Sequence, residues 1–145
     1  MADQTSSSLR VDAEPSAVLE VIADLERYPA WNGEIKEVEV LDQTADGRPA
    51  RARFSLTSNG MSDQYVLAYA WAPDGVSWQL EAPSTLQKKQ IGTYRLAPDG
   101  DGTDVRYQLE IAAKIPMIGP MRRKIEKRIV DGALKELKKR VESLG

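Results

Sequence analysis

Residues 61–71 read MSDQYVLAYAW, and their side chains change character with a period of two. The odd-numbered positions carry the bulky side chains, and the even-numbered positions carry small or polar ones. Successive side chains of a β-strand point to opposite faces of a sheet, so this alternation predicts a strand with one buried face. Besides Asp63, that face would carry Met61, Tyr65, Leu67, Tyr69 and Trp71.

The period of two continues on both sides of this stretch, from Ile35 to Ile111. Dipeptides that accept the positive φ angles of tight hairpin turns interrupt it at Asp46-Gly47, Asn59-Gly60, Asp74-Gly75 and Asp101-Gly102. The strands between and beside these turns are predicted at 35–42, 49–58, 61–71, 75–81, 86–97 and 103–111. Consecutive strands joined by hairpins form an antiparallel meander, which curls around a core on one face.

Before the meander, the sequence predicts a short strand at 8–11 and two short helices. Residues 13–25 form the first helix, because Pro15 suits an initial helical position. The second is a single helical turn at 28–31. The amphipathic stripe of the first helix, with the spacing i, i+3, i+4 and i+7, consists of Val18, Val21, Ile22 and Leu25.

After the meander, residues 116–144 predict one long amphipathic helix. From Pro120 to Ser143 it would be about 36 Å long at 1.5 Å per residue. A helix of that length cannot contact every strand of a concave sheet closely, so we expect a pocket between the two. Its predicted apolar stripe consists of Met121, Ile125, Ile129, Ala133, Leu137, Val141 and Leu144, flanked by Ile118, Val130 and Leu134.

Composition narrows the classes of function. The 145 residues suffice for one domain, 1–145, and the 41% hydrophobic and 29% charged residues are ordinary for a globular protein. No signal-like start and no apolar run near the roughly 20 residues that span a bilayer are present, so a cytoplasmic protein is expected. The sequence has no cysteine and no histidine, which excludes disulfides and Ser-His or Cys-His nucleophiles. No metal and no cofactor is expected, and a binding protein is favoured over an enzyme.

The charge is unevenly distributed along the chain. The net charge is −2, of which residues 1–115 carry −7 and residues 116–145 carry +5. The excess of basic residues in 116–145 would allow binding to an anionic membrane surface or to an acidic carrier protein. Alternatively, it forms a solvated helix face that balances the acidic strands. A pI near 5.3 and the lack of a binding motif argue against nucleic acid. The basic side chains of the final helix are Arg122, Arg123, Lys124, Lys127, Arg128, Lys135, Lys138, Lys139 and Arg140.

Five local phrases carry a family resemblance through their order and spacing. They are Tyr28-Pro29-x-Trp31, Ile35-x-x-Val38-x-Val40-Leu41, Gly92-x-Tyr94-x-Leu96, Gly102-Thr103-x-Val105-x-Tyr107 and Ala133-Leu134-x-x-Leu137-Lys138-x-x-Val141-Glu142. The chain resembles the polyketide cyclase/dehydrase and coenzyme Q-binding branch of the START-like (SRPBCC) superfamily over nearly its whole length. The resemblance implies an α+β helix-grip fold, a curved antiparallel sheet wrapped around the long C-terminal helix. It also implies a deep cavity for lipids, quinones or polyketides, without implying one activity.

Residues predicted to contact a ligand come from the bulky face of the strands and from the first turns of the last helix. Aromatic rings supply apolar area, and tyrosine and tryptophan also supply polar atoms that orient a ligand. The N-terminal part of the helix is chosen because its C-terminal part must also cover the two short helices. The predicted set is Phe54, Leu56, Tyr65, Leu67, Tyr69, Trp78, Tyr94, Tyr107, Leu109, Ile118, Met121 and Ile125.

Catalytic candidates are few. Asp63 and Tyr65 share a face two residues apart, and a carboxylate with a phenol is a workable pair for carbonyl chemistry. Lys88 has the parity of the inward face and would bind a carboxylate or carbonyl there. Each has a simpler interpretation: Asp63 follows the turn at Gly60 and would reach water, and a bulge would carry Lys88 into solvent.

Three hypotheses about function follow from these observations. The first is a non-catalytic protein that binds or carries a hydrophobic or aromatic small molecule. The second is a polyketide aromatase/cyclase or dehydratase that acts on a poly-carbonyl substrate without His, Cys or metal. The third is an adaptor whose basic C-terminal helix docks on lipid headgroups.

Overall fold

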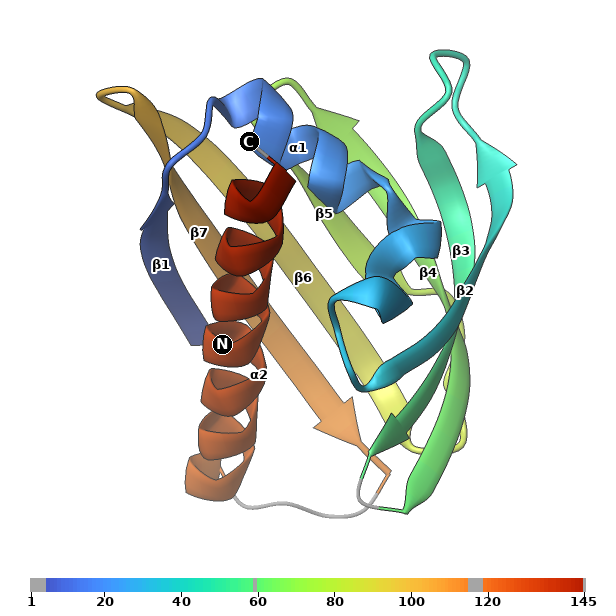
Figure 1. The fold of residues 1–145 in the computed structure, drawn as a ribbon. Coiled ribbons are helices and arrows are strands. Elements are labelled where there is room, and N and C mark those ends of the chain that lie inside the picture. The colour runs from blue at the N-terminus through green and yellow to red at the C-terminus, as the bar shows by residue number, and fades with distance from the viewer. Residues whose placement is uncertain (1–4, 59, 115–118, 145) are drawn as a thin grey trace.

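The computed structural model describes residues 5–58, 60–114 and 119–144, and its elements follow the predicted order (Figure 1). Along the chain these are β1 (Thr5–Val11), α1 (Pro15–Ala23), the 3₁₀ helix η1 (Leu25–Ala30), β2 (Ile35–Gln43), β3 (Pro49–Ser58), β4 (Met61–Ala72), β5 (Gly75–Leu80), β6 (Gln87–Asp99), β7 (Gly102–Ala113) and α2 (Gly119–Leu144).

The strands form one antiparallel sheet in the order β1-β7-β6-β5-β4-β3-β2. The predicted meander is therefore confirmed, and β1 closes it by pairing with β7, Thr5 opposite Leu109. In Figure 1 the sheet curls around one face, on which α2, α1 and η1 lie. The predicted fold class, an α+β helix-grip arrangement, is thus the fold of this chain.

Two of the predicted glycine turns differ in detail. Gly47 and Gly60 have φ angles of 86° and 78°, as hairpin turns require. At the β6–β7 hairpin it is Gly100, with φ 62°, that adopts the left-handed conformation, and Gly102 already begins β7. At position 75, glycine is required by a close contact and not by a positive φ angle, because a Cβ there would lie 2.1 Å from the carbonyl oxygen of Tyr94.

The short helices and β1 also differ from their predicted bounds. The α1 helix ends at Ala23, so Leu25 packs into the core from η1 rather than from the first helix. The η1 helix ends at Ala30, just before Trp31, the last residue of the predicted second turn. The β1 strand begins at Thr5, three residues earlier than predicted, because its serines pair along β7 although they carry no apolar signal.

The buried face of α2 is rotated relative to the predicted stripe. The buried residues are Glu126, Val130, Leu134, Leu137 and Val141. Met121 and Ile129 of the predicted stripe are 50% and 38% exposed, respectively. Steps of four residues turn a helix by about 400°, so a stripe built only from such steps drifts about 40° each time and leaves the core.

The α2 helix packs mainly against β1, β7 and α1. Its Glu126 side chain is fully buried and accepts hydrogen bonds from the N–H of Ile111 (2.7 Å) and from Oγ1 of Thr5 (2.7 Å). Among the described residues the β1–β7 pairing ends at Leu109, and the N–H of Ile111 is bound by Glu126 rather than by a strand. The carboxylate satisfies this N–H and ties the first turns of α2 to the sheet.

Candidate ligand site on the inner face of the sheet

The inner face of the sheet carries a continuous cluster of aromatic side chains on five neighbouring strands. Its members are Phe54, Tyr65, Tyr69, Trp78, Tyr94 and Tyr107. Pairing across the strands explains the cluster, because Phe54 lies opposite Tyr65, Tyr69 opposite Trp78, and Tyr94 opposite Tyr107. Side chains directly opposite one another in an antiparallel pair are close enough for rings to touch.

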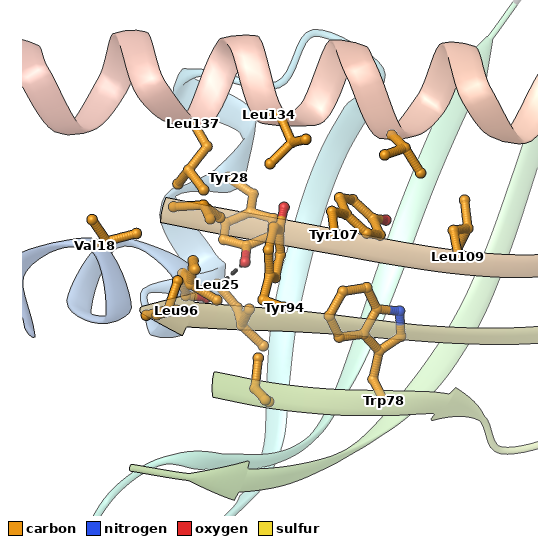
Figure 2. Packing of buried hydrophobic residues seen from close by; sticks show 14 of the residues in the cluster. Val18, Leu25, Tyr28, Trp78, Tyr94, Leu96, Tyr107, Leu109, Leu134 and Leu137 are labelled. Carbon is orange, nitrogen blue, oxygen red and sulfur yellow. Dashed lines mark hydrogen bonds between the residues drawn. The ribbon is translucent and has the colours of Figure 1, made fainter. Parts of the chain in front are cut away.

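Trp78, on the central strand β5, is the hub of this cluster (Figure 2). Its ring centroid lies 5.9 Å from that of Tyr69, 5.5 Å from that of Tyr94 and 5.6 Å from that of Tyr107. Phe54 and Tyr65 form a second, stacked pair with centroids 5.5 Å apart. These separations fall in the range where aromatic rings attract each other.

Gly92 makes room for the indole of Trp78. The two residues are opposite each other in the β5–β6 register. A Cβ at position 92 would lie 2.2 Å from Cζ2 and 2.3 Å from Cε2 of Trp78. The indole therefore lies across the backbone of β6 at this point, and any other residue would displace it.

The tyrosine hydroxyls of the cluster are desolvated and uncharged. Burial raises the pKa of Tyr65, Tyr69, Tyr94 and Tyr107, and nearby acidic groups, including other tyrosines, raise it further. Burial likewise raises the pKa of Tyr28, whose hydroxyl donates to the carbonyl oxygen of Ile22 at 2.6 Å. The other four hydroxyls have no hydrogen-bond partner within the described part of the chain. Neutral phenols can donate to or accept from a bound molecule, but they do not act as bases near neutral pH.

Tyr65 and Tyr69 combine two properties that distinguish the wall of a concave site. Protein surrounds them closely enough for desolvation to be the main cause of their raised pKa values. Their side chains nevertheless keep some solvent-accessible surface. Both belong to β4, a strand outside the main packing surface of α2.

The predicted ligand residues are distributed between this face and the helix. Six are buried on the sheet: Phe54, Leu67, Trp78, Tyr94, Tyr107 and Leu109. Leu56, Tyr65, Tyr69 and Ile125 are half-buried. Met121 is half exposed, because the first turns of α2 have a different phase from the predicted one. Ile118 lies outside the described residues.

Asp63 is buried, contrary to the expectation that it would reach water after the β3–β4 turn. Its carboxylate accepts hydrogen bonds from Oγ of Ser84 (2.6 Å), the N–H of Thr85 (3.2 Å) and Nε2 of Gln87 (3.4 Å). The segment after β5 folds over this end of β4 and covers the carboxylate. Asp63 thus anchors that segment, and its acceptor atoms are already in use.

Lys88 is exposed, as the simpler of its two interpretations predicted, and it does not occupy the inward-facing position. The β6–β7 register shifts between Gln87 and Lys89, which places Lys88 at a bulge. The extra residue of a bulge is left out of the pairing, and the alternation of faces restarts after it. The neighbouring Lys89 pairs with Glu110 at 2.9 Å.

Two functional candidates were missed because both looked like ordinary charges on a solvated helix face. The Nε of Arg122 is buried without a hydrogen-bond partner among the described residues. Burial raises the pKa of Glu136, although the nearby backbone of Gly33 and the charge of Lys139 oppose the shift. No periodicity signal identifies either residue, since each depends on how α2 is rotated against the sheet.

Two pockets lined by described residues lie elsewhere on the molecule. One is between the start of α1 and the β6–β7 hairpin, and the other is between α1, η1 and the C-terminal end of α2. Neither contains a residue that was predicted to contact a ligand. Within the described ranges, no helix is long and apolar enough to cross a membrane.

The fold and the aromatic inner face together define a START-like protein of the helix-grip class. Residues 3–142 match the family described as polyketide cyclase / dehydrase and lipid transport, and the chain belongs to that family. No protein matches it in a search of curated proteins.

Solved structures agree with this assignment. A START superfamily protein from Mycobacterium smegmatis is 28% identical and superimposes with a TM-score of 0.91. The match covers 98% of this chain and 99% of that protein. A protein from Thermus thermophilus is 22% identical over 99% of both chains, with a TM-score of 0.82. An aromatase/cyclase from a Streptomyces species, 13% identical, covers 98% of this chain and 94% of its own with a TM-score of 0.77, and shows the shared fold.

Proposed function

We propose that this protein binds a hydrophobic or aromatic small molecule against the aromatic inner face, between the sheet and α2. The observation that carries the proposal is the set of four tyrosine hydroxyls that lie in an apolar environment without protein partners among the described residues. A hydroxyl in apolar surroundings that no protein group pairs is normally paired with water or a ligand. A molecule with an apolar body and a few polar atoms matches these walls.

Binding without catalysis is favoured by the state of the acid–base candidates. Tyr65 and its neighbours stay protonated near neutral pH because their pKa values are raised, so they can donate a hydrogen bond but do not act as bases. The Asp63 carboxylate is held by three donors, and Lys88 projects into solvent. A cyclase or dehydratase reaction would therefore need a base other than Asp63, Tyr65 or Lys88. The description of the family, which names lipid transport beside cyclase and dehydrase, is compatible with a carrier.

The most direct test is native mass spectrometry of gently purified protein, combined with extraction into organic solvent. We expect a mass increment that disappears after extraction, together with an apolar compound in the organic phase. In parallel, the protein stripped of ligand should bind 1-anilinonaphthalene-8-sulfonate with increased dye fluorescence. A stripped, folded protein that binds neither this dye nor flat aromatic compounds contradicts the proposal.

A second proposal, docking on an anionic membrane, has one observation in its favour. Met121 and Ile129 expose apolar side chains on α2 beside the basic residues of its first turns. Apolar side chains flanked by cations are typical of helices that lie on an anionic lipid surface. Co-sedimentation with phosphatidylserine vesicles at low and high salt tests it, because salt screens surface attraction. Absence of binding at low salt contradicts it. An acidic carrier protein as partner and a cytoplasmic location remain predictions from the sequence.

A further inference from the structure

Two buried nitrogen atoms lack hydrogen-bond partners among the described side chains: Nε1 of Trp78 and Nε of Arg122. Trp78 is only 7% exposed, and its indole has a donor and no acceptor. A guanidinium also only donates. Both unpaired groups therefore require the same complement, a hydrogen-bond acceptor.

The other tryptophan of the β-strands and other arginines show that unpaired donors are exceptional here. Nε1 of Trp71 donates to the carbonyl oxygen of Pro49 at 2.6 Å. Arg51 is held by Glu81 and Asp42. Trp78 and Arg122 differ from these residues because one nitrogen of each has no hydrogen-bond partner among the described residues.

The indole nitrogen of Trp78 is turned toward one end of the site. In Figure 2 it lies on the side of the ring that faces Leu109, away from Leu25 and Val18. Leu109 is followed on β7 by Ile111, whose N–H is bound by Glu126. The donor of Trp78 thus points toward the end of the sheet that the first half of α2 covers.

Arg122 lies at that same end. It precedes Glu126 by four residues, so the two side chains lie one turn apart on the same face of α2. Helical spacing also places Arg122 beside the half-buried Ile125 and Glu136, next to the part of the helix that exposes Ile129. Glu136 lies close enough to Tyr94 to contribute to its raised pKa, so this side of α2 borders the aromatic site at Glu136.

We propose that the ligand is an apolar carboxylic acid that also carries a carbonyl group, with Trp78 and Arg122 as its two polar anchors. The Nε1–H of Trp78 donates to the carbonyl oxygen within the aromatic cluster, and the guanidinium of Arg122 binds the carboxylate. This inference rests on the proposed function, and it adds the polarity of the ligand and its orientation along α2. A hydrocarbon would leave the Nε1–H of Trp78 without a hydrogen bond, and so would a ligand whose buried end carries only hydrogen-bond donors.

Three probes with one ring system separate these contributions: fluorene, 9-fluorenone and 9-fluorenone-2-carboxylate. Dissociation constants are measured by isothermal titration calorimetry, which does not depend on tryptophan fluorescence. The parent protein should bind fluorenone about 3- to 10-fold more tightly than fluorene, the range expected for one neutral hydrogen bond. The parent protein should bind 9-fluorenone-2-carboxylate about 10-fold or more tightly than 9-fluorenone, as expected for a hydrogen bond to a charged group.

Trp78→Phe should remove the preference for fluorenone and leave fluorene binding within about twofold, because the phenyl ring retains most of the apolar surface. Arg122→Gln should remove only the gain from the carboxylate. Trp71→Phe and Arg128→Gln are the matched controls, since Trp71 donates to backbone and Arg128 is exposed. Both controls should keep the preferences of the parent. Retained fluorene binding shows that each variant is folded.

Equal affinity of the parent for all three probes overturns the two anchors while the proposed function stands. A preference for fluorenone that survives in Trp78→Phe overturns the role of Trp78, and a carboxylate gain that is lost equally in Arg128→Gln overturns that of Arg122. If the folded parent binds none of the probes, both this inference and the proposed function fail.

Discussion

The two halves of α2 are built differently, although one continuous helix contains both. In the C-terminal half, Leu134, Leu137 and Val141 are at most 3% exposed. Polar side chains there also tie the helix to β1, as Lys138 donates to the carbonyl oxygen of Arg10 at 2.9 Å. In the N-terminal half, Met121 and Ile129 are exposed, and Nε of Arg122 has no partner among the described residues. The C-terminal half, called the closed half below, therefore completes the core, whereas the N-terminal half, the open half, keeps exposed apolar side chains and a donor that no described residue pairs.

The largest effect is expected in the closed half. Leu137→Ala should lower the free energy of unfolding by about 2–5 kcal/mol, because Leu137 is fully buried and the cavity left behind cannot collapse completely. Ile125→Ala, in the open half, should cost clearly less because Ile125 is half-buried. Urea titrations of both variants check this. Equal losses for the two substitutions would remove the distinction between the halves.

A second effect concerns the sheet beneath the open half. Gly92→Ala should lower the free energy of unfolding by about 1–3 kcal/mol, because the added methyl overlaps the indole of Trp78. Displacement of that indole should also weaken dye binding. Gly33→Ala is the matched control, since a Cβ at position 33 meets no atom within 4 Å. If Gly92→Ala binds the dye like the parent, the position of Trp78 does not matter for the site.

A third effect should be confined to binding. Ile125→Trp should place a large ring at the border of the site and abolish binding of the apolar dye. The free energy of unfolding should change by about 1 kcal/mol, at the low end for an enlarged side chain, because Ile125 is half-buried. Lys124→Trp adds the same ring one position earlier, on an exposed side of the helix, and should leave dye binding unchanged. A folded Ile125→Trp protein that binds the dye normally would show that the site lies elsewhere.

The smallest effect is expected in the C-terminal half, where Glu136 lies near the loop at Gly33. Burial raises the pKa of Glu136, so its charged form is disfavoured in the folded state and folding is favoured by protonation. This contribution to stability is fully present below the ordinary pKa of 4.5 and is lost as the pH rises through the raised value. Glu136→Gln should therefore be more stable than the parent at pH 7 and not at pH 4. Denaturation at the two pH values tests the sign, and an unchanged difference between them contradicts it.

The sequence predicts the strands well because alternation depends only on which face is buried. Strand β3 has the predicted bounds, and the inward parity of Tyr65, Leu67 and Tyr69 is that of the structure. The predicted helix stripe was right at Leu137 and Val141, which are buried, and wrong at Met121 and Ile129, which are exposed. Several nearly equivalent stripes run along an amphipathic helix, and packing against β1 and β7 selects the one through Val130 and Leu134, which were predicted as flanks.

The parts of the site that escaped prediction depend on contacts between distant segments. The bulge at Lys88 arises from how β6 registers against β7, and one strand alone does not reveal it. The burial of Asp63 depends on a segment about twenty residues away that folds over it. Gly92 resembles any turn-forming or flexible glycine until Trp78 is placed across it. Such features need the tertiary arrangement.

The clamp formed by Glu126 also has a consequence for association between molecules. Strand β7 extends past the described part of β1, and an unpaired N–H on a strand edge is a template for pairing with another chain. The carboxylate of Glu126 occupies the N–H of Ile111, and α2 packs against β7. An added strand would therefore have to displace Glu126 before it could bind the backbone at Ile111.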